Sequence, residues 1–232
     1  MHPAASVILF SSASGMGFGL LLWLGLGFPA VTGAAAFALF ALAYLLAVGG
    51  LLASTFHLGH PERALKTFTQ WRTSWLSREA WASVAVLLVM ALYGAGLVFW
   101  GVRWEALGWL GAGLAQLAVL TTGMIYTAIR AVPRWNMRLT PVLFLSLSLT
   151  GGALLAGQVQ AAIGLLLWSG LVQLGHWHLG DRAFARAGTD LASATGLTGG
   201  AVRSFEPPHT GSNYLTREMV FVIGRKHARK LR

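Results

Sequence analysis

The sequence predicts an all-α integral membrane protein, a bundle of about six transmembrane helices followed by a basic, partly helical C-terminal tail. Of its 232 residues, 56% are hydrophobic and only 10% are charged, whereas soluble domains average roughly 25% charged residues. The apolar residues gather in runs of about 20, the length that crosses a hydrocarbon core about 30 Å thick. So few polar side chains cannot cover a water-facing surface, so we expect lipid around most of the chain.

Glycine, proline or charged residues separate the apolar runs, and each run predicts one spanning helix. The predicted spans are residues 7–26, 31–56, 80–100, 106–127, 142–157 and 161–179. They form a transmembrane domain over residues 1–180, and residues 181–232 form a tail that we expect to dock a partner. Glycines cluster inside the spans, and small residues let helices approach closely in lipid.

The positive charge predicts orientation in the membrane. The net charge is +10, and no nucleic-acid recognition motif accompanies it, so nucleic acid is not an expected partner. With six spans, one side carries both termini and most of the basic residues of the connections: Arg63, Lys66, Arg72, Arg78, Arg130, Arg134 and Arg138. The positive-inside rule places this basic side in the cytoplasm, although a basic loop that docks a partner would give the same pattern.

Cysteine is absent from the chain. The chain therefore forms no disulfide and holds no iron–sulfur cluster through its own thiolates. We expect no metal site in it. If the protein transfers electrons, they must enter from another chain.

The connection between the second and third spans holds a histidine and a carboxylate on the basic side. His57 lies where the second span leaves the membrane, Ser77 is a suitable N-cap for the third span, and Glu79 falls in the first turn of that span. This arrangement suits a quinone, whose reduction needs two protons, because imidazole and carboxylate groups at the membrane edge can relay them. The alternative is that both residues only cap helices at the interface.

Two further segments on the basic side carry candidate ligands. Tyr126 ends the fourth span, and Arg130 follows it, where it could bind a quinone carbonyl, a phospholipid or a partner carboxylate, or simply reach the interface. His176 lies near the end of the sixth span, and together with His57 it could ligate a b-type haem. The haem is the less favoured hypothesis, because the spans contain no deeper pair of histidines.

Two motifs resemble the membrane-anchor subunits of dimethyl-sulfoxide-reductase-type molybdoenzymes. Residues 54–64 read Ser-Thr-Phe-His-Leu-Gly-His-Pro-Glu-Arg-Ala, with Leu-Ser-Arg-Glu at residues 76–79. The second match runs through residues 126–135 and ends in Thr-Pro at residues 140–141. The resemblance extends from the first span to about residue 179.

The resemblance implies a quinone or quinol site in the anchor, beside an iron–sulfur subunit of ferredoxin type. A third subunit would hold the molybdenum bis-guanine-dinucleotide cofactor, and the anchor itself usually holds no haem. The family roles place His57 and Glu79 at the quinone as proton donors, and we add Tyr126 and Arg130 as quinone-binding residues. We expect docking residues in the connections and the tail: Arg63, Arg134, His209, Asn213 and Tyr214.

The chain departs from the best-known members in two ways. Those members have eight spans and face the periplasm with the His-Leu-Gly loop, whereas this chain has about six spans and a loop on the side that its charges place in the cytoplasm. This pattern, with the Glu-Pro-Pro-His-Thr-Gly tail at residues 206–211, resembles the respiratory sulfite dehydrogenase branch.

The leading hypothesis is therefore an anchor in the bacterial inner membrane that passes electrons to quinone during sulfite oxidation, inactive without its partners. The alternatives are a quinol-oxidising anchor of a sulfoxide or similar reductase, a structural tether without a quinone site, and a haem-bearing cytochrome b-type subunit.

Overall fold

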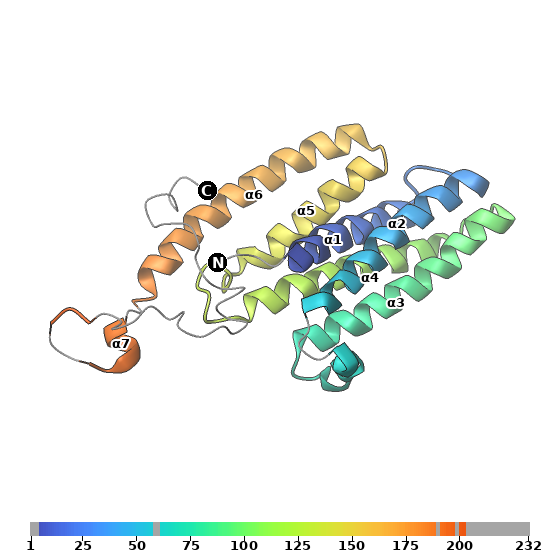
Figure 1. The fold of residues 1–232 in the computed structure, drawn as a ribbon. Coiled ribbons are helices and arrows are strands. Elements are labelled where there is room, and N and C mark those ends of the chain that lie inside the picture. Colours follow the sequence, from blue (N-terminus) through green and yellow to red (C-terminus); the bar gives the residue numbers. More distant parts are fainter. Residues whose placement is uncertain (1–4, 58–60, 189–190, 198–199, 203–232) are drawn as a thin grey trace.

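The computed structural model describes residues 5–57, 61–188, 191–197 and 200–202, and this part of the chain is helical with no strand. The six long helices run roughly side by side as a bundle (Figure 1). Their bounds are α1 Ala5–Gly25, α2 Gly33–Ala53, α3 Trp75–Ala95, α4 Glu105–Thr127, α5 Leu139–Leu155 and α6 Val159–Arg186. Four short elements complete the described fold: η1 Ser54–His57, η2 Pro61–Gln70, the π-helical η3 Gly96–Trp100, and α7 Leu191–Thr195.

The prediction of a membrane helical bundle is confirmed. Five of the long helices have the length and apolar composition to cross a membrane, and α5 is an apolar helix of 17 residues, at the short end of the spanning range. The chain is thus a multi-pass membrane protein.

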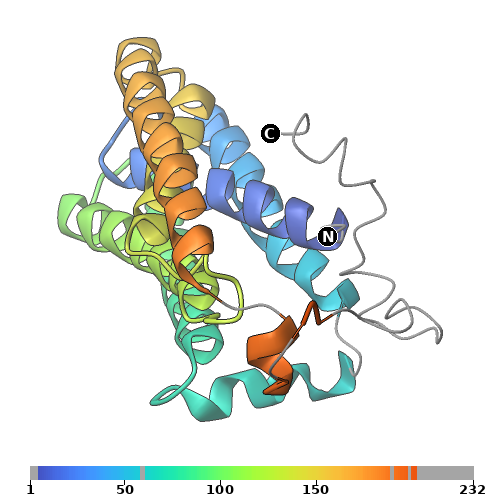
Figure 2. The same cartoon turned by 90° about the vertical axis from the view of Figure 1, so that its left-hand side faces the viewer.

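Helix α1 is the centre of the bundle. It packs against α2, α4 and α5, while α3 pairs with α4. Among the described elements α6 packs only against α5, and it lies at the edge of the bundle in both views (Figures 1 and 2). Side chains of α1 such as Phe18, Leu20 and Leu21 are consequently buried in the core.

Glycines of α1 allow its close contacts, as their clustering predicts. A Cβ atom on Gly17 would lie 2.8 Å from the Ala43 carbonyl oxygen of α2, and one on Gly25 would lie 2.5 Å from the Gly108 carbonyl oxygen of α4. Without a driving force from water exclusion, helices in lipid associate through such van der Waals contact of their backbones.

The start of α3 differs from the expectation. The helix begins at Trp75 and not near residue 80, its N-cap position is Ser74, and Ser77 lies inside the helix. The prediction of Ser77 as the N-cap is therefore wrong, and Glu79 occupies the second turn. The reason is that Ser77 serves η2: its hydroxyl accepts the backbone N–H of Gln70 at 3.1 Å and donates to the Thr67 carbonyl oxygen.

Two other helix ends also depart from the predicted spans. Helix α2 ends at Ala53, and the chain continues to His57 as the 3₁₀ helix η1. Helix α6 continues to Arg186, about two turns beyond the predicted end at residue 179. Pro61 opens η2, in agreement with its suitability for the first position of a helix.

Candidate functional site

A buried carboxyl group lies between α3 and α4 at the basic end of the bundle. Glu79 is only 4% exposed, and the hydroxyl of Thr122, itself 5% exposed, donates a hydrogen bond to its Oε1. A buried carboxyl group without partners is strongly disfavoured in a membrane. Thr122 thus holds Glu79 at a defined position inside the protein.

Two further polar groups lie close to this carboxyl group. Tyr126 follows Thr122 by one turn of α4, and its hydroxyl interacts electrostatically with Glu79. Ser83 follows Glu79 by one turn of α3, is 3% exposed, and has a hydroxyl without a hydrogen-bond partner among the described residues. Buried polar atoms nearly always have a partner, so the Ser83 hydroxyl is available to a ligand or a water molecule.

Aromatic rings fix Tyr126 from two sides. Its ring stacks on Phe144 of α5, with 5.1 Å between centroids and 27° between planes, and meets Trp135 edge-on at 5.5 Å and 84°. The stacked and edge-on geometries are both favourable for aromatic pairs. Tyr126 is therefore a rigid link between the Glu79 cluster and α5.

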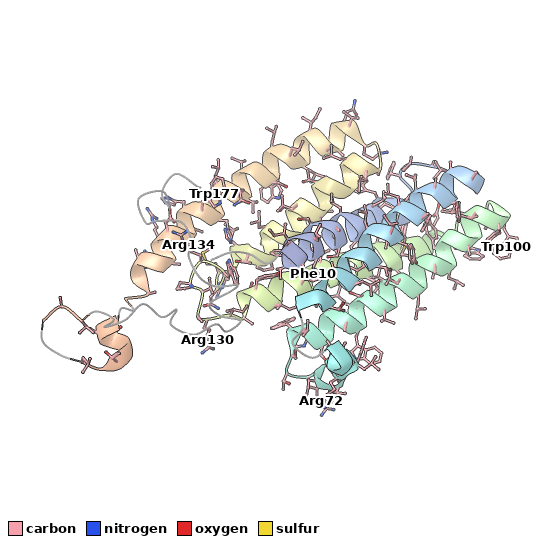
Figure 3. All side chains as sticks on the ribbon, viewed as in Figure 1. Phe10, Arg72, Trp100, Arg130, Arg134 and Trp177 are labelled. Carbon is pink, nitrogen blue, oxygen red and sulfur yellow. The ribbon has the colours of Figure 1, made fainter. Side chains whose placement is uncertain are left out.

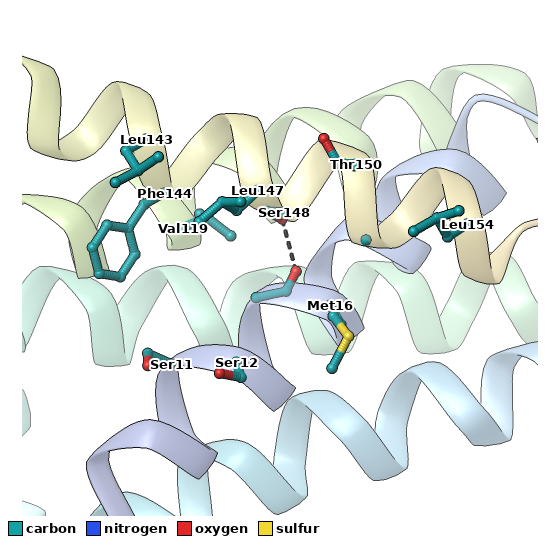
Figure 4. A pocket seen from close by; sticks show the side chains of 12 residues that line it. Ser11, Ser12, Met16, Val119, Leu143, Phe144, Leu147, Ser148, Thr150 and Leu154 are labelled. Atoms are coloured by element: carbon teal, nitrogen blue, oxygen red, sulfur yellow. Dashed lines mark hydrogen bonds between the residues drawn. The ribbon is translucent and has the colours of Figure 1, made fainter. Parts of the chain in front are cut away.

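A cavity of about 390 Å³ opens beside this link, between α1, α4 and α5 (Figure 4). Phe144, which stacks on Tyr126, lines it together with Val119 and Leu147. Its walls are mainly apolar, and the Ser148 hydroxyl at its edge is occupied by a bond of 2.7 Å to the Gly15 carbonyl oxygen, drawn dashed in Figure 4. This size and lining suit a small apolar ligand.

The side chain of His57 lies outside what the structure describes. Its backbone ends η1, which packs against α1 and α2. The side chain of Arg63 is likewise not described, and His209, Asn213 and Tyr214 lie outside the described residues. The predicted roles of these five residues therefore stay predictions.

The arginines of the α4–α5 connection lie at the rim of the basic end (Figure 3). Arg130 is exposed in the turn after α4, so it is not part of the buried cluster. Arg134 forms an ion pair with Asp181 on the last turns of α6, with 3.0 Å between Nη2 and Oδ1. This pair joins the connection to the extension of α6 beyond its predicted end.

His176 lies in the same region but is separately engaged. Its Nε2 is 3.3 Å from the Thr140 hydroxyl at the start of α5. A haem ligated by His57 and His176 stays untested, because the His57 side chain is not described. Among the described residues, no group of three or more His, Asp or Glu side chains is placed to hold a metal ion.

Sequence reasoning missed Thr122, Ser83 and Phe144. Thr122 precedes Tyr126 by four residues, and Ser83 follows Glu79 by four, so each shares a helix face with a predicted residue. That spacing could have marked both as neighbours of the site. Nothing in the sequence distinguishes Phe144 from the other apolar residues of its span.

Comparison with known proteins agrees with the two motifs. Residues 6–168 match the model of the DMSO reductase anchor subunit (DmsC) family. The chain belongs to this family. It is also 34% identical to a sulfite dehydrogenase subunit from Allochromatium vinosum over 263 aligned residues, which cover 98% of this chain and 79% of that protein. No solved structure matches the chain.

Family membership confirms the central prediction from the sequence. The chain is the membrane-anchor subunit of an oxidoreductase complex of the DMSO reductase type, most like the sulfite dehydrogenase anchor. An anchor of such molybdoenzymes implies catalytic and iron–sulfur partner subunits. The matched region covers α1 to α5 and the first part of α6, so it includes the Glu79 cluster and the cavity beside it.

Proposed function

We propose that this anchor transfers electrons from the iron–sulfur subunit to membrane quinone, with the quinone ring bound at the basic end of the bundle. The observation that carries the proposal is the buried carboxyl group of Glu79, held by Thr122 beside Tyr126 and an apolar cavity. Quinone reduction takes two electrons and two protons. The anchor supplies the protons and the binding slot, and the clusters of the partner subunit supply the electrons.

Each described group has a chemical part in this proposal. The cavity between α1, α4 and α5 receives the apolar ring and the start of its tail, and the Tyr126 hydroxyl donates to one ring carbonyl. Glu79 delivers a proton at membrane depth, where water does not reach, and His57 delivers the other from η1. Arg130, exposed at the rim, stabilises negative charge that develops on the ring.

The electron donor in this proposal is sulfite, oxidised to sulfate at the molybdenum subunit. The similarity to the Allochromatium vinosum sulfite dehydrogenase protein along 98% of the chain supports this substrate. The basic connections support a cytoplasmic position for both termini and for the partner subunits. The partners are then an iron–sulfur subunit of ferredoxin type and a molybdenum subunit without a secretion signal.

Variants of the assembled complex test the quinone site. We expect Glu79→Gln and His57→Ala to lower sulfite-dependent quinone reduction by about 100-fold, a typical contribution of acid–base groups. Turnover with a soluble artificial acceptor should stay unchanged, because the molybdenum site is intact. Glu105→Gln is the matched control, since Glu105 is exposed at the opposite end of α3 and α4. Wild-type quinone reduction by both Glu79→Gln and His57→Ala would refute the site.

Two measurements separate the alternatives. A reporter fused to the C-terminus should be cytoplasmic, and a periplasmic reporter would favour the quinol-oxidising anchor of a reductase. A quinone analogue should bind the purified complex. If none binds, the structural tether is correct, and a haem absorption spectrum from the anchor would identify the cytochrome b-type subunit.

A further inference from the structure

A second cavity, of about 650 Å³, runs along the outer face of α3 and α4 and shares no lining residue with the cavity of Figure 4. Trp71, Trp75 and Trp81 surround one end of it, and Leu114 and Leu117 of α4 form its deeper wall. Trp71 and Trp81 are about half exposed. Tryptophans gather at the headgroup level of a membrane, so the groove leads from the headgroup region into the hydrocarbon.

Arg78 lies at the tryptophan end of this groove in a fixed orientation. Its guanidinium lies over the Trp75 ring, with 4.2 Å from Cζ to the centroid. Its Nε donates to the Trp71 carbonyl oxygen at 3.0 Å, and its Nη2 donates to the Arg72 carbonyl oxygen at 2.8 Å. A guanidinium has five N–H donors, so these two bonds orient the group and leave donors for a ligand.

A second cation accompanies the first. Arg72 is exposed, and its guanidinium lies over the Trp71 ring, with 5.4 Å from Cζ to the centroid. In the part of the chain that the structure describes, neither arginine forms an ion pair with an acidic side chain. Figure 3 shows Arg72 at the extremity of the bundle, beyond the start of α3. Two guanidinium groups therefore stand at the mouth of an apolar groove without a counter-charge from the described residues there.

The floor of the groove is open because of small side chains. Ala82 and Ala85 follow Arg78 by one and two turns of α3, toward the middle of the helix, and both line the cavity. Opposite them Leu117 is 45% exposed. A soluble partner protein cannot reach this depth, whereas an acyl chain can.

We propose that this groove binds one anionic phospholipid, with its phosphate between Arg78 and Arg72 and an acyl chain along Ala82 and Ala85. Phosphate is matched by the planar fork of arginine and by charge. The acyl chain is matched by the apolar, lipid-facing walls. This site is separate from the proposed quinone site, because Glu79 and Tyr126 do not line the groove.

Lipid binding to the purified complex tests the proposal. The probe is phosphatidylglycerol titrated into phosphatidylcholine nanodiscs that contain the complex, with bound lipid counted by native mass spectrometry. We expect Arg78→Gln to weaken phosphatidylglycerol binding about fivefold, the effect of one basic side chain near a membrane surface. Arg182→Gln is the matched control, since Arg182 is exposed on α6 at the same end of the bundle, and it should bind as wild type does.

A second variant fills the groove and leaves its charge unchanged. Ala82→Trp should displace phosphatidylglycerol while both arginines remain, and quinone reduction should stay near wild type. Equal binding of phosphatidylcholine and phosphatidylglycerol would refute the choice of an anionic lipid. Retention of phosphatidylglycerol by both Arg78→Gln and Ala82→Trp would refute the site. Loss of quinone binding in these variants, with lipid binding unchanged, would assign the groove to quinone and overturn the proposal.

Discussion

The two ends of the bundle are built in opposite ways. At the end away from the basic residues, short turns join the helices, and backbones touch: Gly25 of α1 packs on Gly108 of α4. Hydrogen bonds to α1 and its turn reinforce this end, from the Tyr93 hydroxyl to the Leu24 carbonyl oxygen at 3.3 Å and from Arg103 Nη2 to the Gly27 carbonyl oxygen at 3.1 Å.

The basic end instead has long connections and polar groups between the helices. Helices η1 and η2 lie between α2 and α3, and residues 128–138 join α4 to α5. Glu79, Thr122 and Tyr126 lie just inside this end. The comparison shows that one end fixes the relative positions of the helices and the other presents chemical groups on them, as a site supported by rigid elements requires.

The largest effect should come from disturbing the closely packed end. In Gly25→Val the new Cβ would lie 2.5 Å from the Gly108 carbonyl oxygen, and backbone atoms cannot move aside cheaply. We expect a loss of about 3 kcal/mol in the free energy of unfolding and a Tm of the solubilised complex lower by about 10 °C.

Gly113→Val is the control for that variant. A Cβ on Gly113 meets nothing within 4 Å, and the residue faces outward from α4. Its Tm should stay within about 2 °C of wild type. If both variants lower the Tm equally, the valine itself, and not the helix contact, is responsible.

A smaller effect should follow from loosening the cluster at the basic end. Thr122→Val removes the donor that holds Glu79, and a hydrogen bond to a charged group contributes about 1.5–3 kcal/mol. We expect kcat/KM for quinone to fall about tenfold, equivalent to about 1.4 kcal/mol, with no change for an artificial acceptor.

The neighbouring Thr121→Val provides the comparison for Thr122→Val. The Thr121 hydroxyl bonds only to carbonyl oxygens of its own helix among the described residues, Leu117 at 3.1 Å and Ala118 at 2.7 Å. Quinone kinetics in this variant should match wild type. Equal losses in the two variants would show that Thr122 acts through α4 and not through Glu79.

The smallest effect concerns the ion pair at the rim of the basic end. Arg134 and Asp181 are 50% and 36% exposed, and exposed pairs contribute about 0.2–1 kcal/mol. A double-mutant cycle of Arg134→Gln and Asp181→Asn, followed by thermal unfolding, should give a coupling energy in this range. A coupling of several kcal/mol would mean that the rim also fixes the helices, and the contrast between the two ends would fail.

The family and the class of fold were predictable from short stretches of sequence. The motif at residues 54–64 and the match through residues 126–135 indicated the anchor family, which the comparisons confirmed. Glu79 and Tyr126, chosen from these motifs, lie in one cluster. Arg130 does not join them in the buried part of the site.

The sequence by itself determined how many helices form and where the polar end lies. A helix in lipid satisfies its backbone hydrogen bonds internally, so each apolar run specifies its own span. Only the tertiary structure decided that α1 is central, that Glu79 meets Thr122, and that Tyr126 stacks on Phe144. These contacts join side chains on different helices, and they depend on which small residues let two helices approach, which no single run of sequence records.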